Sequence, residues 1–240
     1  MASEIKEWLK KLILGYNHFL PSFSQAGEDM LLRGIFRYVN NGFFVDIGAY
    51  DPVIGSNTYF FYKMRNWTGI NIEPNPVNFA LFEKQRKKDI NLNIGISEKE
   101  QQLDYYMFDN LPAMNTFSKE FLIESNLEPY VSEVKKIKTN SLKNILGQYN
   151  PSNRPIDIMN IDVEGMDLQV LTSNDWEKYI PKCIVIEVDK DKIFNGEIHD
   201  FLTAKGYSLK GITPVNTSLN SSCIYLNDKW LETYNNYKPA

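Results

Sequence analysis

The chain has 240 residues, of which 43% are hydrophobic and 23% are charged, and its formal net charge is −4. This composition is typical of a globular protein. The lack of a basic excess argues against nucleic acid as a partner, because neutralising phosphates supplies most of that affinity. No run of about 20 apolar residues predicts a transmembrane segment. We therefore expect a soluble, cytoplasmic protein in which Cys183 and Cys223 are buried and reduced.

We interpret residues 1–240 as a single domain, with a helical lead-in over residues 1–35 and a core over residues 40–230. Within the first twenty residues, apolar side chains recur at helical spacing and are interrupted by Lys and Glu, which is not typical of a signal peptide. A helix packed on the domain is the simplest interpretation. A helix that binds a membrane surface or a partner is the alternative.

From residue 42 onward, the sequence predicts strands and helices in alternation. Short apolar runs predict strands at 42–48, 67–74, 90–97, 102–109, 156–165 and 183–189. Helices are predicted at 57–66, 76–88, 167–171 and 197–207. Residues 111–121 are expected to form a loop leading into a short helix, and residues 134–146 a strand followed by a helix. Strands near 208–211 and 223–226 are expected to close the fold as an antiparallel hairpin.

This alternation predicts an α/β fold with a mostly parallel, doubly wound sheet. Ligands of such sheets bind beyond the carboxyl ends of the strands. The candidate functional residues are therefore those that directly follow each strand.

The first predicted strand ends at Asp46, Gly48 and Asp51. A dinucleotide site would need a G-x-G-x-x-G motif here, whereas this chain has one glycine between two carboxylates. Negative charge repels a diphosphate and suits a cationic ligand such as S-adenosylmethionine. The alternative is that Gly48 only makes a tight turn and Asp46 caps the next helix.

The second predicted strand ends at Glu73 and Pro74. A carboxylate at this point can accept both hydroxyl groups of an adenosine ribose, because it has two acceptor oxygens. The alternative is a surface glutamate in a turn bounded by proline.

Two later strands end in pairs of acids, Asp162 with Glu164 and Glu187 with Asp189. Acids so placed can act as a general base or hold a hard cation, and Mg²⁺ at Asp162, Glu187 and Asp189 is one possibility. Crowding would raise the pKa of each acid. The alternative is that Asp162 caps a helix and the other pair lies in solvated loops.

The segments FVDIGAYDPVIGSNTYFFY, WTGINIEPNPVNF, DINLNIGIS, NTF and NIDVEGMDLQVL, in this order, resemble the FkbM family of methyltransferases, and SQAGEDMLL is similar to the lead-in of many members. The resemblance covers about residues 24–206. It implies a Rossmann-like class I methyltransferase fold with a mostly parallel seven-stranded sheet, helices on both faces and an antiparallel closing hairpin. It also implies S-adenosylmethionine as cofactor, S-adenosylhomocysteine as product, and O-methyl transfer to a hydroxyl of a sugar or glycan.

The resemblance also assigns roles to residues. Asp162 is expected near the transferred methyl group, and Gln25 and Glu28 are expected to close over the cofactor. The full predicted cofactor set is Asp46, Gly48, Ala49, Tyr50, Glu73, Pro74, Asp162, Gln25 and Glu28. The chain departs from the common pattern in having Pro52 where many methyltransferases have a second glycine, and Asp51 where relatives often have histidine.

We predict direct methyl transfer to an acceptor hydroxyl, with a carboxylate accepting the proton. The order of preference for this base is Glu164, Asp162 and then Glu187. His199 is an alternative, but its place in an apolar helical stripe favours a surface or packing role. The predicted acceptor contacts are Asn115, Thr116 and Asp189.

Two other functions compete with this one. A nicotinamide-dependent sugar epimerase or dehydrogenase would use a similar sheet, but the chain lacks the glycine motif and a Tyr-x-x-x-Lys pair in a suitable place. A non-catalytic module that binds adenosylmethionine or a glycan is the other. The expected partner is a sugar or glycan acceptor, and other glycan-synthesis domains are a further candidate.

Overall fold

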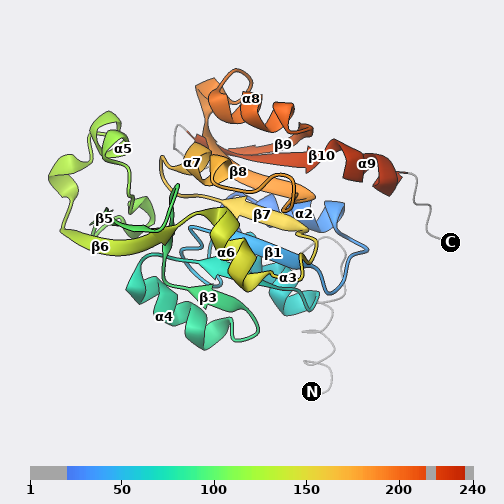
Figure 1. Ribbon diagram of the computed structural model, residues 1–240, viewed down its shortest axis with the longest axis horizontal. Helices are drawn as coiled ribbons and strands as arrows, with labels where there is room; N and C mark the ends of the chain where they lie inside the picture. The colour runs from blue at the N-terminus through green and yellow to red at the C-terminus, as the bar shows by residue number, and fades with distance from the viewer. Residues whose placement is uncertain (1–20, 215–219, 236–240) are drawn as a thin grey trace, which may run out of the picture.

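The computed structural model describes residues 21–214 and 220–235, so the predicted helix of the first twenty residues lies outside the described residues. A seven-stranded sheet with the order β3-β2-β1-β7-β8-β10-β9 forms the centre of the molecule (Figure 1). Its strands are β1 (Phe43–Ile47), β2 (Thr68–Ile72), β3 (Ile90–Leu92), β7 (Ile158–Ile161), β8 (Cys183–Asp189), β9 (Tyr207–Pro214) and β10 (Asn220–Asn227). Strands β3, β2, β1, β7 and β8 are parallel, whereas β10 runs antiparallel to β8 and β9. The Rossmann-like fold and its closing hairpin are therefore confirmed.

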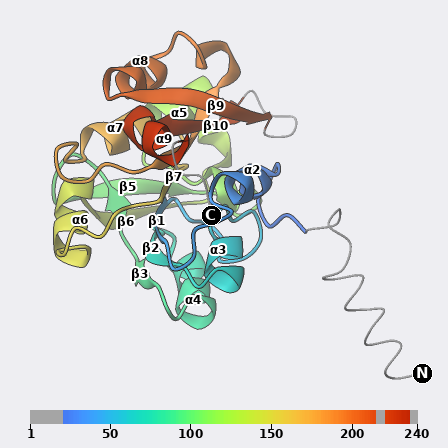
Figure 2. The same ribbon diagram turned by 90° about the vertical axis from the view of Figure 1, so that its right-hand side faces the viewer.

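Helices cover both faces of this sheet, as Figures 1 and 2 show. One face packs against α6 (Leu142–Tyr149), α7 (Asp167–Thr172) and α8 (Glu197–Ala204). The other face packs against α2 (Glu28–Ile35), α3 (Tyr59–Met64) and α9 (Asp228–Asn235). Alternate residues of a strand point to opposite faces, so Val45 belongs to the first core and Phe44 to the second. This arrangement explains why β1 is apolar along almost its whole length.

The helix α4 (Pro76–Gln85) follows β2 and shows how the sequence fixes the start of a helix. The Asn75 side chain accepts a hydrogen bond from the Val77 backbone N–H at 3.0 Å, and Pro76 occupies the first turn. Both features are typical of helix N-termini, because they satisfy or remove backbone donors that have no partner in the helix.

A second, three-stranded sheet was not predicted. It has the order β4-β6-β5 and consists of β4 (Gly95–Ile96), β5 (Gln101–Met107) and β6 (Glu133–Asn140). The chain between β5 and β6 contains three short helices, η1 (Pro112–Met114), α5 (Lys119–Glu124) and η2 (Glu128–Tyr130). This small sheet and α5 lie at the left of Figure 1, beside the main sheet.

The predicted strand over residues 90–97 is wrong in extent, because it is divided between the two sheets. Asn93 leaves the main sheet and donates from its side-chain nitrogen to the backbone carbonyls of Glu73 and Pro74, both at 2.9 Å. The chain then passes close to Phe117, where a Cβ on Gly95 would lie 2.5 Å from the ring. A glycine at this point therefore lets β4 enter the small sheet.

The two cysteines are free and fully buried, as expected. The helix α8 is followed by Gly206 with φ +80, which agrees with the predicted glycine cap. Over residues 21–214 and 220–235, no helix has the length and apolar character of a membrane-spanning segment. A short helix, η3 (Lys190–Lys192), follows β8.

Candidate active site

A cleft of about 590 Å³ lies at the carboxyl ends of β1, β7 and β8, a volume typical of small-molecule sites. Its walls come from the lead-in before α2, the loop after β1, the ends of β7 and β8, and β10. The predicted residues that line it are Gln25, Glu28, Asp46, Gly48, Ala49, Tyr50, Asp162, Glu164 and Glu187. A smaller pocket adjoins this cleft, and its lining adds Glu73, Pro74 and Asn115. Most of the residues predicted from the ends of the strands therefore lie together in the structure.

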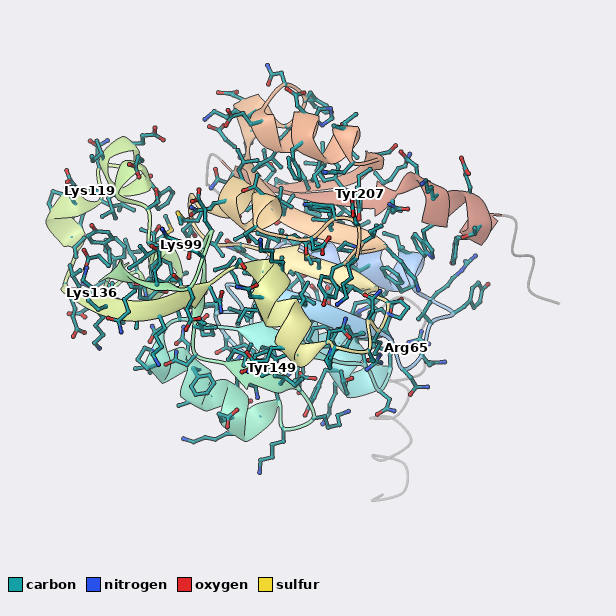
Figure 3. The ribbon with its side chains drawn as sticks, viewed as in Figure 1. Arg65, Lys99, Lys119, Lys136, Tyr149 and Tyr207 are labelled. Atoms are coloured by element: carbon teal, nitrogen blue, oxygen red, sulfur yellow. The ribbon has the colours of Figure 1, made fainter. Side chains whose placement is uncertain are left out.

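The charge of this lining is one-sided. Five carboxylates line the large cleft, from Glu28, Asp46, Asp162, Glu164 and Glu187. Among the residues that the structure describes, no Lys, Arg or His lines either pocket. Figure 3 shows Lys99, Lys119 and Lys136 over the small sheet and its helix instead, and Lys136 pairs there with Asp104 at 2.8 Å. The cleft therefore favours neutral or cationic ligands over anionic ones.

The loops after β1 and β7 meet backbone to backbone at Gly48. This residue has φ +73, and a Cβ placed on it would lie 1.7 Å from the backbone oxygen of Asp162. The Gly48 N–H donates to the Ile72 carbonyl at 3.0 Å, which joins the end of β2 to the same point. Glycine is therefore required here by contact between protein segments, whether or not a ligand approaches.

Glu73 joins the loops after β1 and β2. It is 4% exposed, and its two carboxylate oxygens accept backbone N–H bonds from Asn75 at 2.7 Å and from Tyr50 at 2.8 Å. Burial raises the pKa of Glu73 to about 8, against the effect of these two hydrogen bonds. Each oxygen still has a lone pair with which to accept a ligand hydroxyl.

Asp46 is 2% exposed and, with Glu28 at 1%, is one of the two most buried acids of the cleft. Its carboxylate accepts from the Thr58 hydroxyl at 2.7 Å and from the Asn160 side-chain nitrogen at 2.9 Å. Burial raises the pKa of Asp46, and these two hydrogen bonds oppose that effect. Asp46 is thus held by Thr58, the residue before α3, and by Asn160 of β7, on the face of the sheet that α3 covers.

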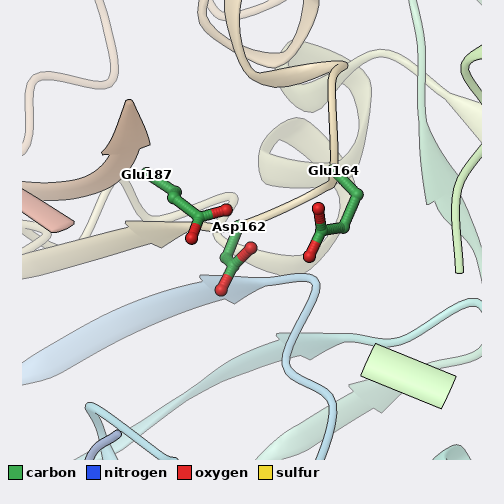
Figure 4. A group of neighbouring side chains, drawn as sticks. All are labelled: Asp162, Glu164 and Glu187. Atoms are coloured by element: carbon green, nitrogen blue, oxygen red, sulfur yellow. The ribbon is translucent and has the colours of Figure 1, made fainter. Parts of the chain in front are cut away.

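Asp162, Glu164 and Glu187 form a carboxylate cluster, in which one oxygen from each residue lies within 4.8 Å of the other two. Figure 4 shows the three carboxyl groups converging, two from the loop after β7 and one from β8. Burial raises the pKa of Asp162 well above its ordinary value, and the nearby Glu187 adds to this. Burial likewise raises the pKa of Glu164 to about 10 and that of Glu187 to about 7. At neutral pH this cluster therefore holds protons that isolated carboxyl groups would release.

The backbone at Glu164 is held in an uncommon conformation. Six described non-glycine residues have positive φ; four are asparagines, and the others are Tyr50 (φ 52) and Glu164 (φ 49). Left-handed conformations of such residues cost roughly 1–3 kcal/mol and are often found at functional sites. The Thr116 hydroxyl donates to the Glu164 backbone carbonyl at 2.6 Å and holds this turn.

The family model described as the methyltransferase FkbM domain matches residues 46–209, more than half of the chain and all of the strand ends described above. The chain belongs to the FkbM methyltransferase family. It is therefore an S-adenosylmethionine-dependent methyltransferase with a Rossmann-like class I fold. This agrees with the resemblance found in its sequence motifs.

Known proteins similar to this FkbM methyltransferase are also methyltransferases. Methyltransferase sdnD from Sordaria araneosa is 25% identical over 199 residues, which are 71% of this chain and 75% of that protein. Precorrin-6y C5,15-methyltransferase from Geobacter metallireducens shares 12% identity at a TM-score of 0.45, over 88% of this chain and 94% of that one. Fibrillarin from Aeropyrum pernix, solved with bound S-adenosyl-L-methionine, shares 9% identity at a TM-score of 0.45, over 82% of this chain and 72% of that one.

Two of the three predicted acceptor contacts do not line either pocket of this methyltransferase. Thr116 is 1% exposed and its hydroxyl is used to hold Glu164. Asp189 accepts from the Asp191 backbone N–H at 3.0 Å and so caps η3. Asn115 lines the smaller pocket, but its side-chain oxygen accepts from the Phe108 N–H at 2.9 Å. The Nδ1 atom of His199 lies 3.1 Å from the Tyr225 hydroxyl, and His199 lines neither pocket.

Sequence reasoning missed the asparagines of the cleft. Asn57, Asn160 and Asn220 all line it, and Asn160 and Asn220 contact the acids Asp46 and Glu187 respectively. Asn160 lies on β7, two positions before Asp162, so its place near the carboxyl end of that strand brings it close to the site. Asn160 lies inside the apolar run of β7, and neither the strand-end acids nor the family motifs used for prediction selected it.

Proposed function

We propose that this enzyme transfers the methyl group of S-adenosylmethionine to a hydroxyl of an uncharged sugar or glycan, and that the carboxylate cluster accepts the hydroxyl proton. The observation that carries this proposal is the position of Asp162, Glu164 and Glu187. Asp162 and Glu164 line both pockets, and Glu187 lines the larger one. A proton acceptor here lies where the smaller pocket, proposed for the adenosine, joins the large cleft, proposed for the amino-acid part of the cofactor and for the acceptor.

The residues present fit the cofactor. S-adenosylmethionine supplies a methyl group made electrophilic by its bond to a positively charged sulfur. A lining with five carboxylates and, in the described part of the chain, no cationic side chain suits that positive charge. The smaller pocket combines Glu73 with the rings of Tyr105 and Phe117, which suits the ribose and base of an adenosine.

The electrostatics of the cluster support Glu187 as the member ionised nearest neutral pH. Its pKa, raised by burial to about 7, is matched to the working pH of a general base, whereas the pKa of Glu164 is raised to about 10. This order differs from the one expected from the sequence, in which Glu164 came first. Because the three groups interact, they gain and lose protons as a unit.

The acceptor is proposed to be uncharged because, among the residues that the structure describes, no Lys, Arg or His lines the cleft to pair with an anion. A sugar phosphate or a uronic acid would carry a buried negative charge without a partner there, which is costly, and any ionised acid of the lining would repel it. Neutral hydroxyl groups can instead bond to the amides and hydroxyls of the lining, such as Ser24, Asn220 and Ser222.

The test is a methyl-transfer assay with labelled S-adenosylmethionine and a panel of neutral glycosides, uronic acids and sugar phosphates. We expect label on a hydroxyl of a neutral glycoside, located by mass spectrometry, and a loss of about 100-fold or more in Glu187→Gln. Label only on anionic sugars, on nitrogen or on RNA would refute the proposal.

The same three carboxylates also have the oxygen ligands that Mg²⁺ prefers. The clustered set contains Glu164 in place of Asp189, which the sequence had suggested as a Mg²⁺ ligand. Treatment with EDTA followed by addition of Mg²⁺ separates the two roles. Activity that survives EDTA supports the carboxylates as the proton acceptor, and loss with recovery by Mg²⁺ supports a bound metal.

A further inference from the structure

A row of polar side chains crosses the main sheet beneath the cleft. Asn71 on β2, Asp46 on β1 and Asn160 on β7 are neighbours in the strand register and lie on the same face. They are 1%, 2% and 7% exposed. Central strands of parallel sheets are usually apolar on both faces, and buried polar groups are retained only with hydrogen-bond partners. The partners of this row therefore indicate what it does.

Whereas Asn71 donates to Asp89 and Asn91, a continuous chain of hydrogen bonds runs through the other two members of this row, Asp46 and Asn160, to the cleft. It begins at Arg86, which is 0% exposed and donates from Nη2 to the Thr58 hydroxyl at 3.1 Å. Thr58 donates to Asp46 at 2.7 Å, and Asn160 donates to the other Asp46 oxygen at 2.9 Å. The Asn57 side-chain nitrogen donates to the Asn160 side-chain oxygen at 2.8 Å. We call these five residues the relay.

Arg86 at one end of the relay and the carboxylate of Asp46 in its middle together fix the direction of every bond in it. A guanidinium group can only donate, so the Thr58 oxygen accepts from Arg86 and its own proton is directed to Asp46. An ionised Asp46 can only accept, so Asn160 turns its NH₂ group toward it and its oxygen toward Asn57. Asn57 must then use its NH₂ group on Asn160, which leaves its side-chain oxygen as the group still to be satisfied.

That oxygen of Asn57 has no partner among the described residues. The atom is buried, and Asn57 lines the large cleft but not the smaller pocket that contains Glu73. A buried acceptor without a donor is uncommon in proteins and often indicates a ligand contact. Of the polar groups of adenosylmethionine, the ammonium is a charged donor, whereas the sulfonium carries no hydrogen.

We propose that the side-chain oxygen of Asn57 binds the ammonium group of the cofactor, and that Arg86 is a positioning residue that acts through Thr58, Asp46 and Asn160. The role of Arg86 is to make the relay present an oxygen, and not an NH₂ group, to the cleft. Its other nitrogens are fixed by Asp89 at 2.8 Å and by the Pro52 carbonyl at 3.0 Å. The proposal rests on adenosylmethionine being the cofactor.

The test compares two ligands by isothermal titration calorimetry. S-adenosylhomocysteine carries the amino-acid group, whereas 5′-methylthioadenosine has the same nucleoside and sulfur without it. In Asn57→Ala, the affinity for S-adenosylhomocysteine should fall roughly tenfold to a hundredfold, the range for a hydrogen bond to a charged group. The affinity for methylthioadenosine should not change, and its binding reports that the protein is folded.

Asn174→Ala is the matched control. Asn174 is also buried, its side-chain oxygen also lacks a partner, and its nitrogen donates to the Tyr179 carbonyl at 2.9 Å, but it lines neither pocket. Both ligands should bind this variant as they bind the wild type. Equal losses for both ligands in Asn57→Ala, or no loss for either, would overturn the proposal.

The relay itself is tested at Thr58. Thr58→Val keeps the shape but removes the hydroxyl, so it should weaken S-adenosylhomocysteine selectively, and Thr58→Ser should restore the affinity. A Thr58→Val variant that binds both ligands like the wild type would reject the role of Arg86. If the wild-type protein binds neither ligand, adenosylmethionine is not its cofactor. That result differs from a variant that loses affinity equally for both ligands, which contradicts only the role of Asn57.

Discussion

Glu187→Gln tests the electrostatics of the carboxylate cluster through stability. Burial raises the pKa of Glu187 from 4.5 to about 7, and the charges of Asp167 and Glu28 add to the effect. In the unfolded chain the group ionises near its ordinary value, so between these two pH values the folded protein binds more protons than the unfolded one. The free energy of unfolding contributed by Glu187 therefore falls as pH rises from about 4.5 to 7.

The size of the effect follows from the two pKa values. A pKa difference of one corresponds to 1.36 kcal/mol, so the step from 4.5 to about 7 corresponds to at most about 3 kcal/mol. Glu187 is partly exposed, and screening by solvent reduces this to about 1–2 kcal/mol. At pH 8, Glu187→Gln should therefore be more stable than the wild type by about 1–2 kcal/mol, or roughly 2–8 °C in melting temperature.

Urea denaturation at pH 4.5 and pH 8 measures this difference. Near pH 4.5 the variant and the wild type should have nearly the same free energy of unfolding, because the folded carboxyl group is protonated there. The exposed Glu177→Gln provides a control that should change little at either pH. An equal gain at both pH values, or a loss at pH 8, would refute the argument from burial and neighbouring charge.

Three further results are expected. Gly48→Ala places a Cβ 1.7 Å from the backbone oxygen of Asp162 at a residue with φ +73. Its free energy of unfolding, measured by urea denaturation, should therefore fall by at least about 2 kcal/mol. A fall of less than about 0.5 kcal/mol would contradict the backbone contact. Thr116→Val removes the hydrogen bond that holds the Glu164 turn, so it should slow methyl transfer about fivefold or more without lowering the affinity for S-adenosylhomocysteine. Thr116→Ser should restore the rate. Equal rates in the wild type and both variants would show that Thr116 does not position Glu164. Glu73→Ala should weaken both S-adenosylhomocysteine and methylthioadenosine in calorimetry, since both contain the ribose, and a selective loss would place Glu73 elsewhere on the ligand.

The sequence predicted the main sheet well because its central strands are short apolar runs with clear ends. The strand predicted at 183–189 coincides with β8, and β1 and β2 lie within their predicted ranges. The small sheet was missed for a physical reason. The transfer of the chain from β3 to β4 depends on the contacts of Asn93 and Gly95 with distant segments, which leave no local pattern.

The candidate site was predicted as far as strand ends determine it. Asp46, Glu73 and Asp162 follow from the topology alone. The positions of Thr116 and Asp189 near the motifs did not reveal where their side chains bond, one to a backbone carbonyl and the other to the start of η3. The relay could not be predicted, because the role of an amide side chain depends on which neighbour accepts from its nitrogen and which donates to its oxygen.

The walls of the cleft extend beyond the segment that the family model matches. That segment covers residues 46–209, whereas the lead-in supplies Gln25 and Glu28, and β10 supplies Asn220 and Ser222. A protein trimmed to residues 46–209 would lose residues 43–45 of β1 and all of β10, so both the main sheet and the walls around the carboxylates depend on chain outside the matched segment. Water reaching Glu187 would return its ionisation to the range of a surface acid. The reactivity of the cluster is thus set by two segments of chain that contain none of its three acids.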